Sequence, residues 1–375
     1  MTTVGMGMSG GIDSAVACHR LLNRTDVDLF GFTMRIGDLE AQHDRTCCSM
    51  EDLMDAKKMC DEFGIPHYTI DVEALFKESV VEPFVEGYLR GQTPNPCVWC
   101  NRTVKIGYLV EKIRKLGGDY LAMGHYVRRD QYGGSPRLLR GRDKDKDQSY
   151  YMAFVNRDYL DYVWFPIGHF EKDDVRAYAQ KHDLLVADKQ ESQSICFVPD
   201  MDYKKFIRQY TGNEPEPGEI LNIEGEIVGE HSGIENYTIG QRKGLGIAHS
   251  EPLYVLKIKA EDNQLIVGEK DRLDQDCFQV GKINWLVDQP VEHCQVQIRY
   301  NGDPMPCRIE PFEDEEGEGH RVILEQSEQG ISPGQIAVYY QENQMLGGSV
   351  ITEASLPWET QPEMKARIEP RPAPA

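Results

Sequence analysis

The sequence has no apolar run of about 18 residues, the length that a helix needs to span a lipid bilayer. Its first residues, MTTVGMGMSGG, do not place an apolar stretch after a basic one, so we expect no secretory signal. Ten cysteines in a chain of 375 residues without such a signal argue against a disulfide scaffold, because the cytosol keeps thiols reduced. We therefore expect a cytoplasmic protein with reduced cysteines and no membrane partner, and the sequence carries no signal for its oligomeric state.

Positive charge is also scarce. Lys and Arg number 41 against 62 Asp and Glu, which gives a net charge of −21 and a pI near 4.9. A surface of this average charge argues against nucleic acid as a partner, although binding depends on local patches. Residues 128–146, RRDQYGGSPRLLRGRDKDK, hold seven basic side chains and three acidic ones, and are a candidate basic patch.

The first half of the chain alternates short apolar runs with helical periods. Strands are expected at 2–8, 28–34, 67–72 and 119–125, and helices at 14–24, 51–63, 74–90 and 102–116. Such alternation is typical of an α/β domain with a parallel sheet covered on both faces, here over residues 1–205.

The pattern changes near residue 206. EPEPGEILNIEGEIVGEH and LYVLKIKAEDNQLIVGEK each place a polar turn between apolar runs, which predicts hairpins in a small β-rich domain at 206–272. Apolar–polar alternation over 273–360 predicts a C-terminal antiparallel β-barrel or sandwich. The Pro-rich end, 361–375, is expected to be a disordered tail.

The sharpest local signal is GMSGGIDS, residues 7–14, where a predicted strand meets a predicted helix. Glycines allow the backbone to approach an anion, and the free N–H groups of the helix start can bind it. Asp13 can cap the helix or help to hold Mg²⁺. The segment lacks GxxxxGK[ST] and the dinucleotide fingerprint, so it is neither of those phosphate loops. The alternative is a plain strand–helix turn.

SGGIDS directly after the first strand resembles the PP-loop of ATP pyrophosphatases, which cleave ATP between the α and β phosphates. The resemblance implies that ATP binds, with Mg²⁺, at Gly7, Met8, Ser9, Gly10, Gly11, Ile12, Asp13 and Ser14. It also implies that Met34 and Gly124 lie near the adenosine. Enzymes of this kind activate a carbonyl oxygen as an AMP ester, which a nucleophile then displaces.

A second feature is the CxxC of TPNPCVWCN, formed by Cys97 and Cys100. No second CxxC follows, as most zinc sites would require, and two prolines place the motif in a loop rather than in a thioredoxin-like turn. A thiol at the entrance of the helix at 102–116 could have its pKa lowered by that helix N-terminus. Cys196, in ESQSICF, follows about a hundred residues later.

Eight blocks together resemble one family, the tRNA-specific 2-thiouridylases of the MnmA/TrmU type, in order and spacing over about residues 3–352. These blocks are GMSGGIDS, TPNPCVWCNRTVK, GHYVRR, LLRGRDKDKDQSYYM, ESQSICF, TIGQRKGLGI, IRY and SPGQIAVYY. The resemblance implies that ATP adenylates O2 of the wobble uridine of tRNA. Cys196 then matches the position that receives a persulfide sulfur from a carrier protein or a cysteine desulfurase, and Cys100 the nucleophile that helps to release it.

The same resemblance implies the contacts with tRNA. The matching positions are Asn95, Pro96, Cys97, His125, Lys146, Asp147, Gln148, Arg299, Tyr300 and Gln335. Many family members carry Asp where this chain has Cys97. Cys97, Cys100 and Cys196 could therefore hold a 4Fe–4S cluster, as in related tRNA thiolases, and this alternative stands beside the persulfide relay. Cys47 and Cys48 have no assigned role.

Two other classes of protein remain open. A different PP-loop enzyme, such as an argininosuccinate, GMP or NAD synthetase, would share SGGIDS but not the cysteine blocks or the C-terminal β-domain. The other class is a non-catalytic, metal-bound RNA-binding module, in which the glycine loop would bind no nucleotide.

Overall fold

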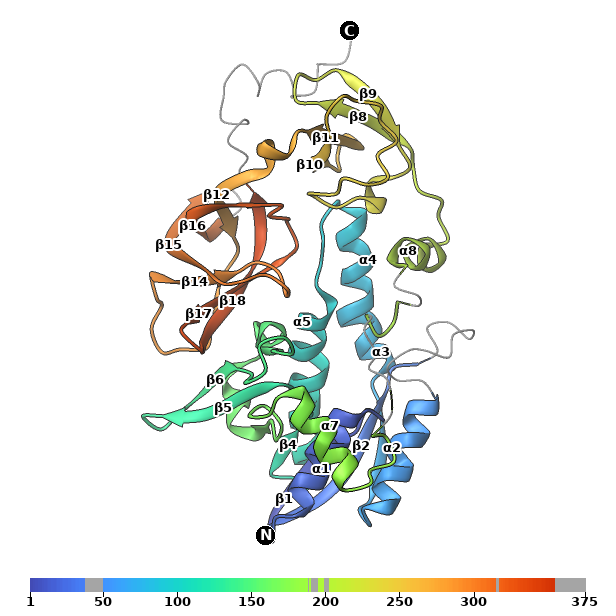
Figure 1. Cartoon of the computed structure of the whole chain (residues 1–375), viewed down its shortest axis with the longest axis vertical. Helices are drawn as coiled ribbons and strands as arrows, with labels where there is room; N and C mark the ends of the chain where they lie inside the picture. Colours follow the sequence, from blue (N-terminus) through green and yellow to red (C-terminus); the bar gives the residue numbers. More distant parts are fainter. Residues whose placement is uncertain (38–49, 188, 190–194, 199–201, 315–316, 355–375) are drawn as a thin grey trace.

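The computed structural model describes residues 1–37, 50–187, 189, 195–198, 202–314 and 317–354. An α/β part lies at the N-terminal end of the molecule, a small sheet at the opposite end, and a barrel beside the helices that join them (Figure 1). Cys47 and Cys48 lie outside the described residues.

The N-terminal part is built on a parallel sheet of order β3-β2-β1-β4-β7. Its strands are β1 (Thr2–Gly7), β2 (Val27–Arg35), β3 (His67–Asp71), β4 (Tyr120–Ala122) and β7 (Val163–Trp164). One face packs on α1 (Ile12–Leu22), α2 (Met50–Glu62) and α7 (Lys172–Lys181). The other face packs on the helices between residues 73 and 115. The predicted α/β fold class is confirmed.

Of the two helices on that second face, the first matches the predicted helix at 74–90 and the second departs from its prediction. The first comprises α3 (Glu73–Phe76), the π-helical η1 (Lys77–Val81) and α4 (Glu82–Leu89). The second begins earlier than expected and comprises α5 (Pro96–Cys100), the π-helical η2 (Asn101–Tyr108) and α6 (Leu109–Lys115). The placement of the CxxC motif in a loop was therefore wrong. Pro96 occupies the first helical position, where its missing N–H costs nothing, and the Asn95 side chain accepts from Val98 N at 3.4 Å.

The two π-helical segments lie against each other. Thr103 Oγ1 donates to Ser79 Oγ at 3.0 Å, which joins η2 to η1. A Cβ at Gly107 would lie 2.4 Å from the carbonyl oxygen of Arg102, five residues back. The wide turn that follows Cys100 thus depends on a glycine, and such turns often accompany functional sites.

A hairpin of β5 (Val127–Tyr132) and β6 (Ser135–Arg140) leaves the parallel sheet and joins the C-terminal sheet instead, where Leu139 pairs with Gln344. The short helices η3 (Ser149–Met152) and η4 (Arg157–Tyr162) follow. α8 (Tyr203–Thr211) leads to the central part of the chain. The hairpin therefore places residues of the N-terminal part within the C-terminal β-structure.

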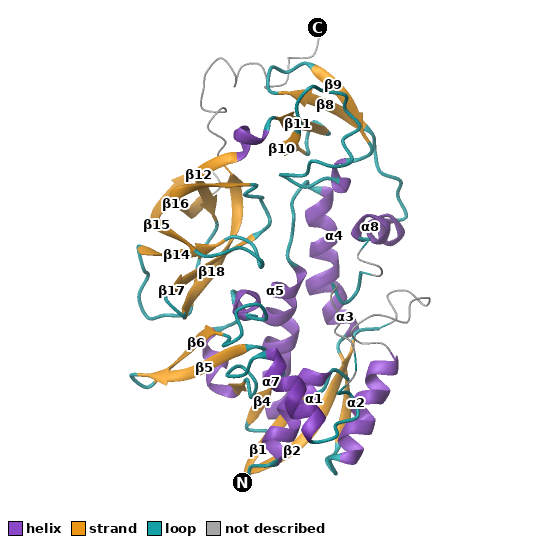
Figure 2. Ribbon diagram, in the orientation of Figure 1, coloured by secondary structure: helices purple, strands orange, loops and turns teal. Residues whose placement is uncertain are grey.

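The central part is a four-stranded sheet of order β10-β11-β8-β9 (Figure 2). Its strands are β8 (Gly218–Asn222), β9 (Ile227–His231), β10 (Tyr254–Lys259) and β11 (Gln264–Gly268), and two short helices, η6 (Ile234–Asn236) and η7 (Lys270–Leu273), accompany them. Both predicted hairpins are present, β8 with β9 and β10 with β11.

The C-terminal part closes into an antiparallel barrel because β12 pairs with both β16 and β18. The strands are β12 (Asp274–Val280), β13 (Asn284–Trp285), β14 (His293–Gln297), β15 (Met305–Asp314), β16 (Gly317–Gln329), β17 (Ile336–Gln341) and β18 (Gln344–Ala354). Tyr340 and Ile336 of the barrel belong to the same buried cluster as Tyr150 and Val104 of the N-terminal part. Among the described residues, no helix is long and apolar enough to cross a bilayer.

Candidate active site

The glycine loop lies at the carboxyl end of β1, where Gly7 is the last strand residue. Gly10 has a φ of +72°, and a Cβ there would lie 2.5 Å from the carbonyl oxygen of Asp52 in α2. Gly11 is the residue before α1 and makes no side-chain cap. Ser14 Oγ accepts from Ser9 N at 3.2 Å and donates to Gly11 O at 2.9 Å, which closes the loop on itself. Backbone that close to a helix start can approach phosphate oxygens, so the loop fits ATP.

Two side chains of the loop point into the core rather than toward a ligand. Met8 and Ile12 are buried in the core between the sheet and α1, so only their backbone can face a ligand. Met34, near the end of β2, is partly buried against the other core cluster. A Cβ at Gly124 would lie 2.9 Å from Ser14 N. Gly124 therefore brings the chain after β4 into contact with the loop.

Asp13 does not cap α1 but forms a partly buried ion pair that the sequence did not reveal. Lys172 Nζ donates to its two carboxylate oxygens at 2.8 and 2.9 Å, and Tyr126 Oη donates to Oδ1 at 2.7 Å. The Lys172 side chain is 5% exposed and the Asp13 side chain 31%. The Lys172 ammonium thus lies beside the candidate phosphate site. Lys172 is the first residue of α7, and no sequence motif predicted its position there.

Lys189, a neighbour of Cys196 in the sequence, is tied to the same region. Lys189 Nζ donates to Asp52 Oδ1 at 2.8 Å and to Asp55 Oδ2 at 2.7 Å, both in α2. These hydrogen bonds raise the pKa of Lys189 in spite of the opposing effect of burial. Because the Asp52 backbone contacts Gly10, α2 links the glycine loop to Lys189, which precedes Cys196 by seven positions in the sequence.

The two candidate catalytic cysteines belong to one packing environment. Cys100 is 6% exposed within the core cluster on the helical face, and Cys196 is half-buried against that cluster. Phe197 anchors Cys196, because its ring packs edge-on against Phe84 at 5.3 Å and Phe76 at 5.6 Å. Cys97 lies in the first turn of α5 and is more accessible than Cys100. Within the described part of the chain, no three His, Cys, Asp or Glu side chains converge in a way that could hold a metal ion.

Several candidate tRNA contacts meet where the barrel touches the start of α5. Gln335 Nε2 donates to Thr93 O at 2.7 Å, and Thr93 N donates to Pro333 O at 2.9 Å. The rings of Tyr300 and Tyr151 stack at 4.5 Å. Burial raises the pKa of both phenols, and the Cys97 thiol contributes to both shifts. The barrel thus places Tyr300 and Gln335 near the segment of Asn95, Pro96 and Cys97.

The remaining candidates for contact with RNA differ in how far their side chains are already bonded within the protein. Asp147 and Gln148 are engaged within the protein: Asp147 is buried and accepts from Gly141 N at 2.8 Å, and Gln148 Oε1 accepts from Tyr126 N at 2.9 Å. Lys146 lies one residue before them and is half-buried. Arg299 is half-exposed and paired with Glu328 at 2.5 Å.

His125 is buried beside Phe165, and its Nδ1 has no hydrogen-bond partner. Burial, helped by the positive charge of Lys105, lowers its pKa to about 3. The ring is therefore neutral near pH 7, so it can contact RNA only as a neutral hydrogen-bonding group.

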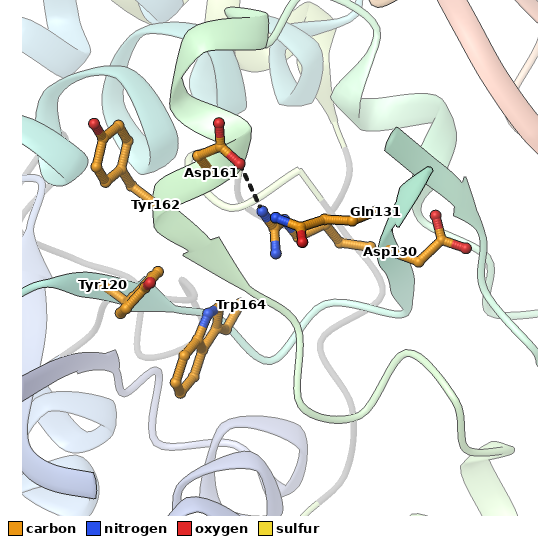
Figure 3. Close-up of a pocket in the computed structure, with 7 residues that line it drawn as sticks. Tyr120, Asp130, Gln131, Asp161, Tyr162 and Trp164 are labelled. Carbon is orange, nitrogen blue, oxygen red and sulfur yellow. Dashed lines mark hydrogen bonds and ion pairs between the residues drawn. The ribbon is translucent and has the colours of Figure 1, made fainter. Parts of the chain in front are cut away.

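A cavity of about 620 Å³ lies elsewhere, at the edge strand β7 (Figure 3). It is lined by Tyr120, Arg129, Asp130, Gln131, Asp161, Tyr162 and Trp164. Tyr120 and Trp164 stack on each other at 4.6 Å, and Arg129 pairs with Asp161 at 3.0 Å. None of the candidate site residues lines it, so this cavity is not the candidate active site.

Fold and site together define a nucleotide-binding α/β domain of the PP-loop type that is joined to two β-domains. Three family models match the chain. They are the tRNA methyl transferase HUP domain over residues 2–200, the tRNA methyl transferase PRC-barrel domain over 204–269, and the aminomethyltransferase β-barrel domain over 275–351.

Curated relatives cover nearly the whole chain. The tRNA-specific 2-thiouridylase MnmA of Rickettsia africae is 42% identical over 357 residues, 94% of this chain and 97% of the relative. That of Geotalea uraniireducens is 41% identical over 360 residues, 94% of this chain and 95% of the relative. The chain belongs to the family of tRNA-specific 2-thiouridylases, which confirms the resemblance found in its sequence.

Among solved structures, the U34-tRNA thiolase NcsA from Methanococcus maripaludis with its [4Fe-4S] cluster is 18% identical, with a TM-score of 0.35. That match covers 56% of this chain and 66% of NcsA, and so low a likeness does not bear on the site.

Proposed function

We propose that this protein is an ATP-dependent tRNA-uridine 2-sulfurtransferase that converts the wobble uridine to 2-thiouridine. The observation that carries the proposal is the arrangement at the carboxyl end of the sheet. The glycine loop with Asp13 and Lys172 lies there, α2 links it to Lys189, and both Cys100 and Cys196 pack with the core cluster on the helical face of the sheet. A phosphate site and two thiols in one region suit activation of a carbonyl oxygen followed by attack of sulfur.

The first step is adenylation. O2 of the uridine attacks the α-phosphate of ATP, and pyrophosphate leaves from the glycine loop. Gly10 and Gly11 would bind the phosphates through backbone N–H groups, and Lys172 offsets the charge of the Asp13 carboxylate beside them. Mg²⁺ bound with ATP would screen the phosphate charge, while both Asp13 oxygens stay hydrogen-bonded to Lys172 and Tyr126. The product is an AMP ester, so C2 of the base becomes open to attack.

The second step is sulfur transfer. Cys196 carries a persulfide received from a sulfur-carrier protein or a cysteine desulfurase. Its terminal sulfur attacks C2 and AMP leaves with the bonding electron pair. The Cys100 thiolate then attacks Cys196 Sγ, the persulfide S–S bond breaks, and its electrons stay with the sulfur on the base. A Cys100–Cys196 disulfide remains, and an external thiol reductant reduces it to the two free thiols.

A 4Fe–4S cluster would need Cys97, Cys100 and Cys196 as one ligand set. As placed among the described residues, these thiols do not form such a group. The persulfide relay is therefore the version proposed, and no step is assigned to a cluster.

The target base must leave its stack to reach the edge of the sheet. The contact between the barrel and the start of α5 supports the assignment of tRNA binding to this junction. The reaction is placed in the cytoplasm, where tRNA and reduced thiols are available.

The proposal is tested with unmodified tRNA transcript, ATP and a persulfide donor. Release of AMP should depend on the tRNA, and nucleoside mass spectrometry should detect 2-thiouridine at the wobble position. AMP release that depends instead on ammonia or an amino acid would assign the chain to a different PP-loop reaction.

A further inference from the structure

Arg140, the last residue of β6, joins a polar network that crosses from the N-terminal part into the barrel, to which Ser149 Oγ also connects through Tyr340 Oη at 3.0 Å. Its Nη1 donates to Asp147 Oδ2 at 3.1 Å, and its Nη2 donates to Gln297 Oε1 at 2.7 Å. The guanidinium carbon lies 3.8 Å from the centre of the buried Tyr340 ring. A planar group that is paired at two edges and stacked on one face has little freedom to move.

The first partner of Arg140 shapes the loop that carries Lys146. Besides Arg140, the Asp147 carboxylate accepts from Gly141 N at 2.8 Å, from Ser149 N at 3.0 Å and from Ser149 Oγ at 2.9 Å. Asp147 is 8% exposed, so these bonds are shielded from water. The carboxylate thus ties both ends of the loop around Lys146 to Arg140.

The second partner shapes a turn of the barrel. Gln297 is 4% exposed, and its Nε2 donates to the carbonyl oxygens of Arg299 at 3.0 Å and Tyr300 at 2.8 Å. Arg140 holds the other end of this amide, which fixes which way its N–H groups point. The turn that presents Arg299 and Tyr300 therefore depends on Arg140 although the guanidinium does not touch that turn.

We propose that Arg140 is a positioning residue for the RNA substrate, which fixes the loop of Lys146 relative to the turn of Arg299 and Tyr300. The inference rests on the proposed function. Two contact groups held at a set separation can engage one RNA without a further ordering cost, whereas two independent groups must be ordered during binding. Lysine cannot replace this arginine, because one ammonium cannot make the fork and the stack together.

The test is Arg140→Lys in the full-length protein, measured with tRNA transcript and ATP. The KM for tRNA should rise about tenfold, equivalent to about 1.4 kcal/mol. The KM for ATP and the kcat at saturating tRNA should stay close to wild type. The matched control is Arg137→Lys in the same strand, where Arg137 forms a forked pair with Asp130 at 2.6 and 3.1 Å and lies over Tyr132. This control should leave the KM for tRNA unchanged.

A double-mutant cycle with Lys146→Ala separates positioning from general damage. If Arg140 acts by placing Lys146, Lys146→Ala should weaken tRNA binding clearly in the wild-type background and hardly at all in the Arg140→Lys background. Additive losses, or a fall in kcat with an unchanged KM for tRNA, would overturn the inference. If Arg140→Lys does not fold, the cycle is made with Gln297→Leu and Arg299→Ala instead. Arg299→Ala should then weaken tRNA binding clearly in the wild-type background and hardly at all in the Gln297→Leu background. A wild-type protein that binds no tRNA would overturn the proposed function itself, which distinguishes that failure from this one.

Discussion

Lys172 Nζ lies 2.8 Å from Asp13 Oδ1, so a buried ammonium pairs with the one carboxylate of the glycine loop although 159 positions separate them. The pair explains why an acidic residue is compatible with a phosphate site, since the nearby cation offsets its charge. It also means that Asp13 has a structural role, which a test of its chemical role must separate.

Asp13→Ala should abolish tRNA-dependent AMP release while tRNA binding persists. It should also lower the free energy of unfolding by about 2 kcal/mol, because the Lys172 ammonium loses its partner. The double variant Asp13→Ala/Lys172→Met removes the unpaired cation and should recover much of that stability without recovering AMP release. AMP release near the wild-type rate in either variant would leave the nucleotide role of the loop without support.

The association with tRNA should depend steeply on salt in spite of the net charge of −21, because a local basic patch releases counterions from the RNA. Lys146→Glu should weaken binding and lower the slope of log affinity against log salt concentration by about 1. Filter binding between low and physiological salt measures both quantities. An affinity that does not change with salt would speak against an RNA substrate.

The Arg299–Glu328 pair offers a variant that should strengthen binding. Glu328→Gln removes the anion that competes with RNA phosphate for the guanidinium, so affinity should rise about twofold at low salt. Glu310→Gln is the matched control, since it removes the same charge from another barrel pair, Arg308 with Glu310 at 2.8 Å. An equal gain in both variants would mean that only net charge matters and that Arg299 has no special role.

The sequence predicted those features that depend on local pattern. The glycine loop between β1 and α1, the hairpins β8–β9 and β10–β11, and the closing β-structure all follow from short-range alternation and turn residues. The start of α5 was missed because Pro96 was taken as a helix breaker, although proline suits the first helical position.

Long-range features left no local signal. Nothing within KDDVR indicates that Lys172 reaches Asp13, and nothing in SPRLLR indicates that β6 adds to a sheet built some two hundred residues later. The basic patch at 128–146 was recognised as a charged run. In the structure Arg137 and Arg140 are engaged within the protein, so the charge count overstated what that run offers to RNA.

The burial of His125 predicts how the free energy of unfolding depends on pH. The pKa of His125 is about 3 in the folded protein, below the ordinary value of 6.5, so the unfolded chain binds a proton between these values and the folded chain does not. Its contribution to stability is therefore complete above about pH 6.5 and is lost as the pH falls, by about 2 kcal/mol between pH 7 and pH 5. His125→Asn should remove this part of the pH dependence in chemical denaturation, whereas His249→Asn, at an exposed position, should not. An unchanged pH dependence in His125→Asn would show that the imidazole protonates in the folded protein.

The cysteines make the last prediction, which decides between the two sulfur routes. Cys100→Ala and Cys196→Ala should each abolish 2-thiouridine formation, because the relay needs both thiols. Cys97→Asp should keep much of the activity, since Cys97 lies in the first turn of α5 and takes no part in the relay. Cys196 should accept labelled sulfur from a persulfide donor, and a Cys100–Cys196 disulfide should accumulate after one turnover without reductant.

The deciding measurement is the activity of iron-free protein with a persulfide donor under strict chelation. The relay predicts robust thiolation in this assay, and Cys18→Ala serves as a control for the loss of a thiol, because Cys18 is buried in the core of α1. If activity is absent there and returns only with iron, sulfide and absorbance near 400 nm, about where iron–thiolate charge transfer lies, the relay is wrong. Cys97→Asp would then weaken cluster binding, so this one variant gives opposite results for the two routes.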